Sequence, residues 1–161
     1  MKKLLKLPVS ILRIKKFGSR AKNIPSIKEN IRLSIYLSLK DIKARKWETA
    51  YELLKYIISV EYVRHAELKN SSELEEADLN FYKRITSNQA SMAEYQFSLQ
   101  TLSRMLHQHH KQAPVIIIDE YDTPIQEGFV NGYYDEAMEF IRNFFSALSS
   151  RNRRRIFWAF F

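Results

Sequence analysis

The feature that most constrains the fold of this chain is the run Pro-Val-Ile-Ile-Ile-Asp-Glu-Tyr-Asp at residues 114–122. Four consecutive β-favouring apolar residues, Val115 to Ile118, predict a short strand that is buried on both faces. Two carboxylates, Asp119 and Glu120, follow at the point where this strand would end. Because ligands of open α/β sheets bind beyond the carboxyl ends of the strands, this position favours a functional site.

An Asp-Glu pair at the end of such a strand is the Walker B pattern of P-loop nucleotidases. Mg²⁺ prefers hard oxygen ligands, so Asp119 would hold the ion directly or through water. Glu120 would orient or deprotonate the water that attacks the phosphate. The same residues also fit a buried strand that ends in an acidic turn, since Asp122-Thr123-Pro124 is favourable turn chemistry by itself. The pattern alone leaves both interpretations open.

Hydrophobic periodicity predicts an alternation of strands and helices along the chain. An earlier strand is expected at residues 34–39, and residues 156–161 could begin a later one. The expected helices span residues 46–68, 72–85, 91–109 and 133–149. Residues 121–131 are expected to form a loop. This order indicates an α/β fold, with a parallel sheet and helical crossovers.

The expected helices carry start signals and apolar stripes. Ser72 with Glu75, and Ser91 with Glu94, have the spacing of a capping box. In the helix expected at residues 46–68, the side chains expected to face the core are Trp47, Ala50, Tyr51, Leu53, Leu54, Ile57, Ile58, Val60 and Tyr62. This helix is therefore expected to be well buried.

The charge of the chain is unevenly distributed. Residues 1–46 hold 14 Lys and Arg against 2 Asp and Glu, a net charge of +12, whereas residues 47–161 hold 12 against 16, a net charge of −4. We expect residues 1–30 to be a basic, loosely ordered segment that precedes a domain at residues 31–161. Basic segments of this kind can contact nucleic acid or an anionic membrane surface.

The composition limits the class of protein. An apolar fraction of 45% is typical of a globular chain rather than a disordered one. The chain has no cysteine, which excludes disulfides and thiolate chemistry and fits a cytoplasmic location. It has no stretch of about 18 apolar residues, so no membrane span is expected.

Five stretches of the chain follow one another in a familiar order. They are residues 35–43, 62–68, 98–102, 116–125 and 132–142, of which Ile-Ile-Ile-Asp-Glu-Tyr-Asp-Thr-Pro-Ile at 116–125 is the most specific. Together they resemble the AAA-ATPase-like domain of bacterial and archaeal proteins, over roughly residues 34–150. The resemblance implies a P-loop fold that binds ATP with Mg²⁺. By resemblance, Asp119 takes the Mg²⁺ role and Glu120 the catalytic, water-activating role.

Two parts of the family pattern have no counterpart in this sequence. The Walker A loop, Gly-x-x-x-x-Gly-Lys-Ser/Thr, is missing, since none of Gly18, Gly128 and Gly132 fits it. The family's sensor strand does not match residues 153–161. The sequence therefore predicts a partial P-loop NTPase sheet, incomplete at both ends, which is the central part of an ATP-hydrolysing domain. We expect it to bind ATP and Mg²⁺ weakly or not at all, and to be inactive alone.

Other hypotheses remain open at this stage. The chain could be a non-enzymatic remnant or interaction module whose basic ends contact nucleic acid or a membrane surface. Asp119 to Asp122 also match the Asp-Glu-x-Asp box of helicases, which likewise need a P-loop. A sheet that lacks its first strand exposes apolar edges, so a homo-oligomer or low solubility is expected for the isolated chain.

Overall fold

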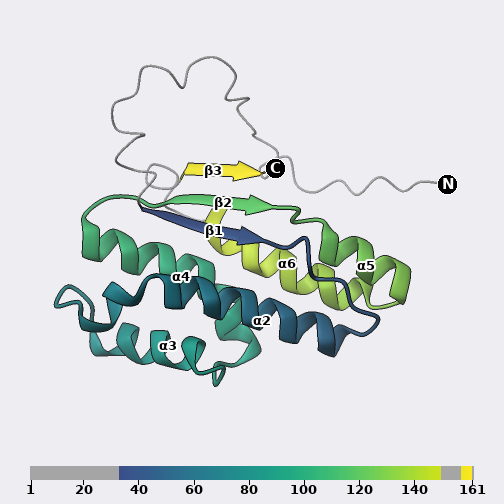
Figure 1. Cartoon of the computed structure of the whole chain (residues 1–161), viewed down its shortest axis with the longest axis horizontal. Helices are drawn as coiled ribbons and strands as arrows, with labels where there is room; N and C mark the ends of the chain where they lie inside the picture. The colour runs from purple at the N-terminus through teal and green to yellow at the C-terminus, as the bar shows by residue number, and fades with distance from the viewer. Residues whose placement is uncertain (1–32, 150–156, 161) are drawn as a thin grey trace, which may run out of the picture.

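The computed structural model describes residues 33–149 and 157–160, and it joins their strands in one parallel sheet (Figure 1). The strands are β1 (Ser34–Ser38), β2 (Val115–Asp119) and β3 (Phe157–Phe160), in the order β1-β2-β3. Both neighbouring pairs are parallel. The α/β fold and the parallel sheet are therefore confirmed, with β2 as the central strand. The segment at residues 1–30 lies outside the described residues.

Helices make both connections between the strands. Between β1 and β2 lie α2 (Trp47–Arg64), the 3-10 helix η2 (Ala66–Asn70), α3 (Glu76–Thr86) and α4 (Met92–His110). Between β2 and β3 lie α5 (Thr123–Asn131) and α6 (Tyr134–Ser149). In Figure 1 these helices lie on one side of the sheet, with α3 far from the strands. The predicted helical crossovers are thus confirmed.

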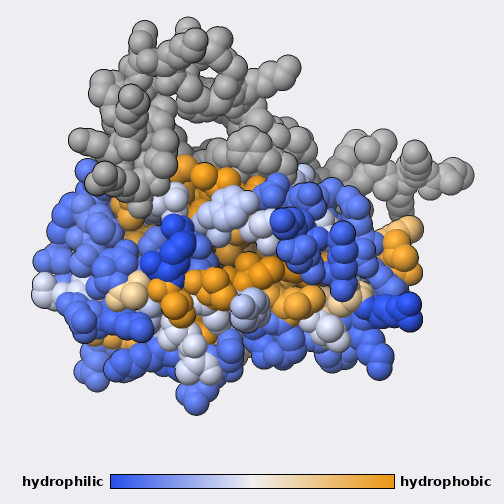
Figure 2. All heavy atoms as spheres, in the orientation of Figure 1, coloured by the Kyte–Doolittle hydropathy of each residue, from blue (hydrophilic) through white to orange (hydrophobic). Residues whose placement is uncertain are grey.

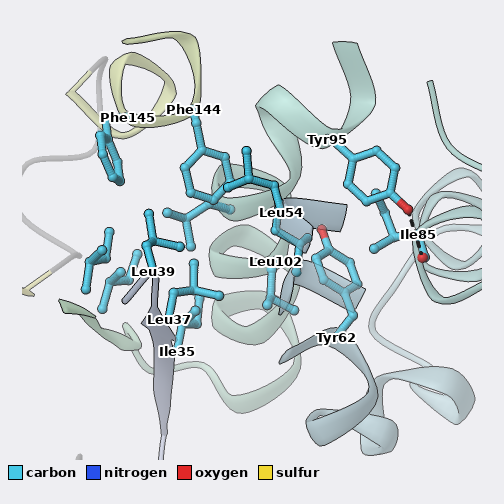
Figure 3. Packing of buried hydrophobic residues seen from close by; sticks show 14 of the residues in the cluster. Ile35, Leu37, Leu39, Leu54, Tyr62, Ile85, Tyr95, Leu102, Phe144 and Phe145 are labelled. Carbon is cyan, nitrogen blue, oxygen red and sulfur yellow. Dashed lines mark hydrogen bonds between the residues drawn. The ribbon is translucent and has the colours of Figure 1, made fainter. Parts of the chain in front are cut away.

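The core lies between the sheet and the helices. Ile35 and Leu37 of β1, and Ile116 and Ile118 of β2, are at most 2% exposed. Figure 3 shows β1 side chains facing Leu54 of α2, Leu102 of α4 and Phe144 of α6. Val115 and Ile117, on the opposite face of β2, are only partly buried. The predicted burial of β2 on both faces is therefore wrong, because the described helices cover one face.

Buried tyrosines connect the helices through their hydroxyl groups. Tyr62 donates a hydrogen bond of 2.6 Å to the carbonyl oxygen of Ser98, which joins α2 to α4. Tyr82 donates one of 2.9 Å to the carbonyl oxygen of Tyr62, which joins α3 to α2. The Tyr95 hydroxyl reaches the carbonyl of Ile85, drawn as the dashed line in Figure 3. The three helices of the first crossover are thus held by polar contacts inside an apolar core.

Two of the predicted helix boundaries differ from the structure. The helix expected at residues 46–68 ends at Arg64, because the chain tightens into η2 after the N–H of His65 bonds to Tyr62. The helix expected at residues 72–85 begins at Glu76. Its N-cap is Glu75, which makes no side-chain cap, so the predicted capping box of Ser72 with Glu75 does not form.

The capping box of Ser91 with Glu94 at the start of α4 is confirmed. The N–H of Glu94 donates to Ser91 Oγ at 3.3 Å, and the N–H of Ser91 donates to Glu94 Oε2 at 2.8 Å. Two of the helix's first N–H groups are thereby satisfied.

The outer face of α2 is more apolar than expected. Val60, predicted to face the core, is 50% exposed, whereas Ser59 and Glu61 beside it are buried. Tyr56 and Val63 of α2 and Tyr36 of β1 are also exposed. Figure 2 shows an apolar band across the face on which Figure 1 places α2 and β1.

The predicted loop at residues 121–131 is wrong, since most of it forms α5. The helix begins after Asp122 with Pro124 in its first turn, and it ends at Gly132, whose φ of 84° is left-handed. Gly128 in its middle is explained by close packing. A Cβ atom there would lie 3.1 Å from Ala137 Cβ and 3.1 Å from the carbonyl oxygen of Tyr133. Glycine thus lets α5 approach α6.

Candidate functional site

The site predicted from sequence lies at the carboxyl end of β2, the central strand. Parallel register sets Ser38, the last residue of β1, beside Asp119, the last residue of β2. The N–H of Leu39 donates to the carbonyl oxygen of Asp119 at 2.9 Å, which extends the ladder by one bond. Both strands therefore end together, at the edge where Figure 1 shows the start of α5. Open α/β sheets bind ligands at such an edge.

Within the described residues, only one oxygen of the Asp119 carboxylate accepts a hydrogen bond. Ser38 Oγ–H donates to Asp119 Oδ2 at 3.2 Å. Among the described residues, Asp119 Oδ1 has no hydrogen-bond partner. The side chain is partly exposed, so Oδ1 is in reach of solvent or a ligand.

Glu120 ends the strand in an unusual backbone conformation. Its φ is 49°, in the left-handed region that a residue with a side chain rarely adopts. The N–H of Thr123 donates to the Glu120 carbonyl oxygen at 3.1 Å, and Thr123 Oγ1 to Glu120 Oε2 at 3.4 Å. The turn thus ties both the backbone and the carboxylate of Glu120 to the start of α5, while the side chain remains exposed.

Asp122 accepts hydrogen bonds from the first turn of α5. Its carbonyl oxygen accepts hydrogen bonds from the N–H groups of Ile125 and Gln126. Gln126 Nε2 donates to Asp122 Oδ2 at 2.6 Å. This third carboxylate of the sequence motif therefore has a local structural role, as the interpretation of an acidic turn predicted for it.

The charges of Asp119 and Glu120 are not neutralised within the described part of the chain. Other carboxylates there are paired with cations, such as Asp78 with Arg104 and Glu94 with Arg84. No ion pair between described residues includes Asp119 or Glu120. Within residues 33–149 and 157–160, the end of β2 thus carries two neighbouring carboxylates that have no cationic partner.

These two carboxylates could hold a cation only with help from other ligands. Within residues 33–149 and 157–160, no three His, Cys, Asp or Glu side chains are placed to enclose a metal ion. Mg²⁺ commonly takes one or two carboxylates and fills its remaining positions with water and substrate phosphate. Oxygen donors at a partly exposed strand end fit that mode of binding.

A charged cluster of Glu61, Arg64 and His65, which was not predicted from sequence, lies along the outer edge of β1. Glu61 of α2 is only 6% exposed, and its Oε1 accepts a 2.9 Å hydrogen bond from the N–H of Tyr36. Arg64 pairs with Glu61 at 2.6 Å and also donates to the carbonyl oxygen of Ser34. His65 Nε2 lies 3.3 Å from Glu61 Oε1. One signal was available in the sequence, since Glu61 interrupts an otherwise apolar stretch of helix.

Hydrogen bonding sets the charge state of Glu61. Burial by itself would raise the pKa of its carboxyl. Hydrogen bonds from His65, Arg64 and the Tyr36 N–H, with the charge of Arg64, outweigh burial and lower that pKa below its ordinary value. Glu61 is thus a charged structural group, and its partners come from α2 and β1 rather than from the end of β2.

Comparison with known proteins gives one match. A family described as predicted AAA-ATPase matches residues 19–161, which includes every described strand and helix. Neither the curated proteins nor the solved structures that were compared include a match. Among the described helices, none has the length and apolar character needed to cross a membrane.

Proposed function

The chain belongs to the family of predicted AAA-ATPases, and on that premise we propose that it supplies the Mg²⁺-binding, water-orienting strand of an ATP-hydrolysing P-loop site. In this proposal β2 is the Walker B strand, Asp119 binds Mg²⁺ and Glu120 is the catalytic base. One observation carries it. Among the described residues, an aspartate whose Oδ1 has no hydrogen-bond partner ends the central parallel strand, and a glutamate with no ion-pair partner follows it.

Asp119 would bind the cation, and Glu120 would act on the attacking water. Asp119 Oδ1 is the oxygen available to the ion, directly or through a water molecule. Bound Mg²⁺ would neutralise charge on the phosphates of ATP. Glu120 is exposed and close in the chain to that oxygen, so its carboxylate can take a proton from a water molecule. The contact from Thr123 limits where that carboxylate can lie.

The phosphate-binding half of the site is not assigned to this chain. The sequence contains no Gly-x-x-x-x-Gly-Lys-Ser/Thr, whose N–H groups and lysine hold the phosphates in P-loop proteins. We therefore propose weak Mg-ATP binding by residues 1–161 alone, and hydrolysis only where a phosphate-binding loop from outside this sequence completes the site. The cysteine-free composition supports action in the cytoplasm.

Calorimetric titration of the full chain with Mg-ATP tests this function. We expect weak binding, with a dissociation constant of about 1 mM, which corresponds to about −4 kcal/mol. Asp119→Ala should abolish it. Asp41→Ala is the matched control, since Asp41 is an exposed aspartate just beyond the end of β1, and it should bind as the unmodified chain does. No binding, or binding that survives Asp119→Ala, would overturn the proposal.

A second candidate function follows from the charge distribution. The net charge of +12 on residues 1–46 suits nucleic acid or an anionic membrane surface, and most of these residues lie outside the described part of the chain. An interaction module of this kind should bind nucleic acid with an affinity that falls steeply with salt. Such binding, with no response to Mg-ATP, would favour this candidate.

A further inference from the structure

We propose that Ser38 is a positioning residue that orients the Asp119 carboxylate for a divalent cation. This inference rests on the proposed function, because it concerns the same site. Ser38 belongs to β1, 81 residues before Asp119 in the chain, and only the parallel pairing of β1 with β2 brings the two together.

The pairing of the strands fixes where the hydroxyl lies. Ser38 and Asp119 are register partners, so their side chains stand next to each other on one face of the sheet. The backbone bond from Leu39 to Asp119 continues the ladder past this pair. The backbone of Ser38 is thus fixed by strand pairing. Its hydroxyl donates to Asp119 Oδ2 at 3.2 Å.

A hydroxyl donor does what a charged donor could not do at this position. Arg104 binds both carboxylate oxygens of Asp78, through Nη1 and Nη2, and neutralises that aspartate. Ser38 binds one oxygen of Asp119 and adds no charge. Rotation of the carboxylate about its last torsion is broad in the absence of a partner. One neutral hydrogen bond therefore favours one orientation and leaves Oδ1 with its charge available for a cation.

The competing interpretation is that this hydrogen bond only helps to join β1 to β2. A partly buried hydrogen bond of this type contributes to stability whether or not a cation binds. The two interpretations differ in what removal of the hydroxyl changes. Under both, loss of the hydrogen bond lowers stability. A positioning role also predicts weaker metal binding by the folded chain, whereas a purely structural role predicts a change in stability alone.

Binding of Mn²⁺, followed by the electron paramagnetic resonance signal of the free ion, separates the two roles. The informative pair is Ser38→Thr and Ser38→Val, because these side chains have nearly the same shape and only threonine keeps the hydroxyl. Both are β-branched and suit a strand. We expect Ser38→Thr to bind Mn²⁺ as the unmodified chain does, and Ser38→Val to bind about tenfold more weakly. Loss of the hydrogen bond should lower the melting temperature of Ser38→Val, so binding is measured well below the melting temperatures of both variants.

Each other outcome overturns a definite part of the proposal. Equal Mn²⁺ affinity of Ser38→Thr and Ser38→Val would overturn the positioning role while the metal site stands. Loss of affinity in both, with unmodified affinity in the smaller Ser38→Ala, would show crowding by the branched side chain and would also overturn it. No binding by the unmodified chain, or binding that Asp119→Ala leaves intact, would instead overturn the metal site itself, and the role of Ser38 with it.

Discussion

Glu120 has a left-handed backbone although it is not a glycine. A φ of 49° costs a residue with a Cβ atom about 1 kcal/mol or more, and the cost is borne at the residue proposed to activate water. Thr123 holds the conformation in place, since the carbonyl oxygen and the carboxylate of Glu120 both accept hydrogen bonds from it. Strain of this kind is consistent with a side chain kept where function requires it.

Replacement of Glu120 by glycine should therefore relieve the strain. We expect Glu120→Gly to unfold with a free energy about 1 kcal/mol higher than Glu120→Ala, because alanine keeps the Cβ atom that opposes this φ. Urea denaturation followed by circular dichroism measures the difference. Equal stability of the two variants would mean that Glu120 is not strained.

At the residue scale, the sequence identified the carboxylates but not what surrounds them. Asp119 and Glu120 were predicted because they directly follow an apolar run in the chain. Ser38 was not predicted as a partner, since it reaches Asp119 only through long-range strand pairing. The left-handed Glu120 had no signal either, because glycine or asparagine normally marks such a position.

The start of α4 depends on a cap that can be removed by one substitution. We expect Ser91→Ala to lower the free energy of unfolding by about 1 kcal/mol, because the N–H of Glu94 loses its acceptor. Ser72→Ala is the matched control. Ser72 has the same spacing to a glutamate but is exposed and caps no helix, so its loss should change stability by less than about 0.5 kcal/mol. Thermal denaturation of both variants, side by side, checks the contrast, and equal losses would contradict it.

Side chains of α2 contact the outer edge of β1, where no described strand pairs with it. Glu61 accepts from the N–H of Tyr36, and Arg64 donates to the carbonyl oxygen of Ser34. Unpaired edge groups invite pairing with other chains, and this arrangement occupies two of them. Part of this edge is thus occupied, and the expected association through exposed apolar edges stays a prediction.

The charge of Glu61 should make stability depend on pH. Because the pKa of Glu61 is lowered in the folded state, its contribution is complete above the ordinary carboxyl pKa of 4.5 and is lost as pH falls through the lowered folded value. Glu61→Gln keeps an acceptor for Tyr36 but has no charge. We expect it to be less stable than the unmodified chain by about 2 kcal/mol near neutral pH, with a smaller difference in acid.

Urea denaturation of both proteins at neutral pH and at several values below 4.5 measures this difference. Glu67, Glu73 and Glu94 also have lowered pKa values, so the unmodified chain alone cannot isolate Glu61. The difference between the two proteins does so. A difference that stays constant with pH would contradict the charged state of Glu61.

At the element scale, most helices and strands were predictable and one helix was not. The apolar side chains of α4 repeat at helical spacing, and five of them are buried: Tyr95, Leu99, Leu102, Met105 and Leu106. α5 was missed because it is short and has Gly128 at its centre, which is unfavourable for a helix in isolation. Its packing against Ala137 explains the glycine, and such tertiary contact is not visible in local sequence.

At the scale of the whole molecule, the fold places Asp119 and Glu120 at the carboxyl end of its central strand, with no ion-pair partner among the described residues. The parallel sheet was predicted from the order of elements, but the position of β2 between β1 and β3 depends on pairing across the chain. Its one-sided burial was also unpredicted, since four apolar residues in a row do not tell one buried face from two. The proposed function depends on this arrangement more than on any single residue.

The central claim is that divalent cations bind at the end of β2. The most direct test is to add Mn²⁺ to the isotopically labelled full chain and to follow the loss of amide signals by nuclear magnetic resonance. The signals of Ser38, Asp119 and Glu120 should broaden first, and Asp119→Ala should remove the effect. Broadening centred instead on other exposed acidic residues, such as Glu75 and Glu76 at the start of α3, would contradict the assignment of the site.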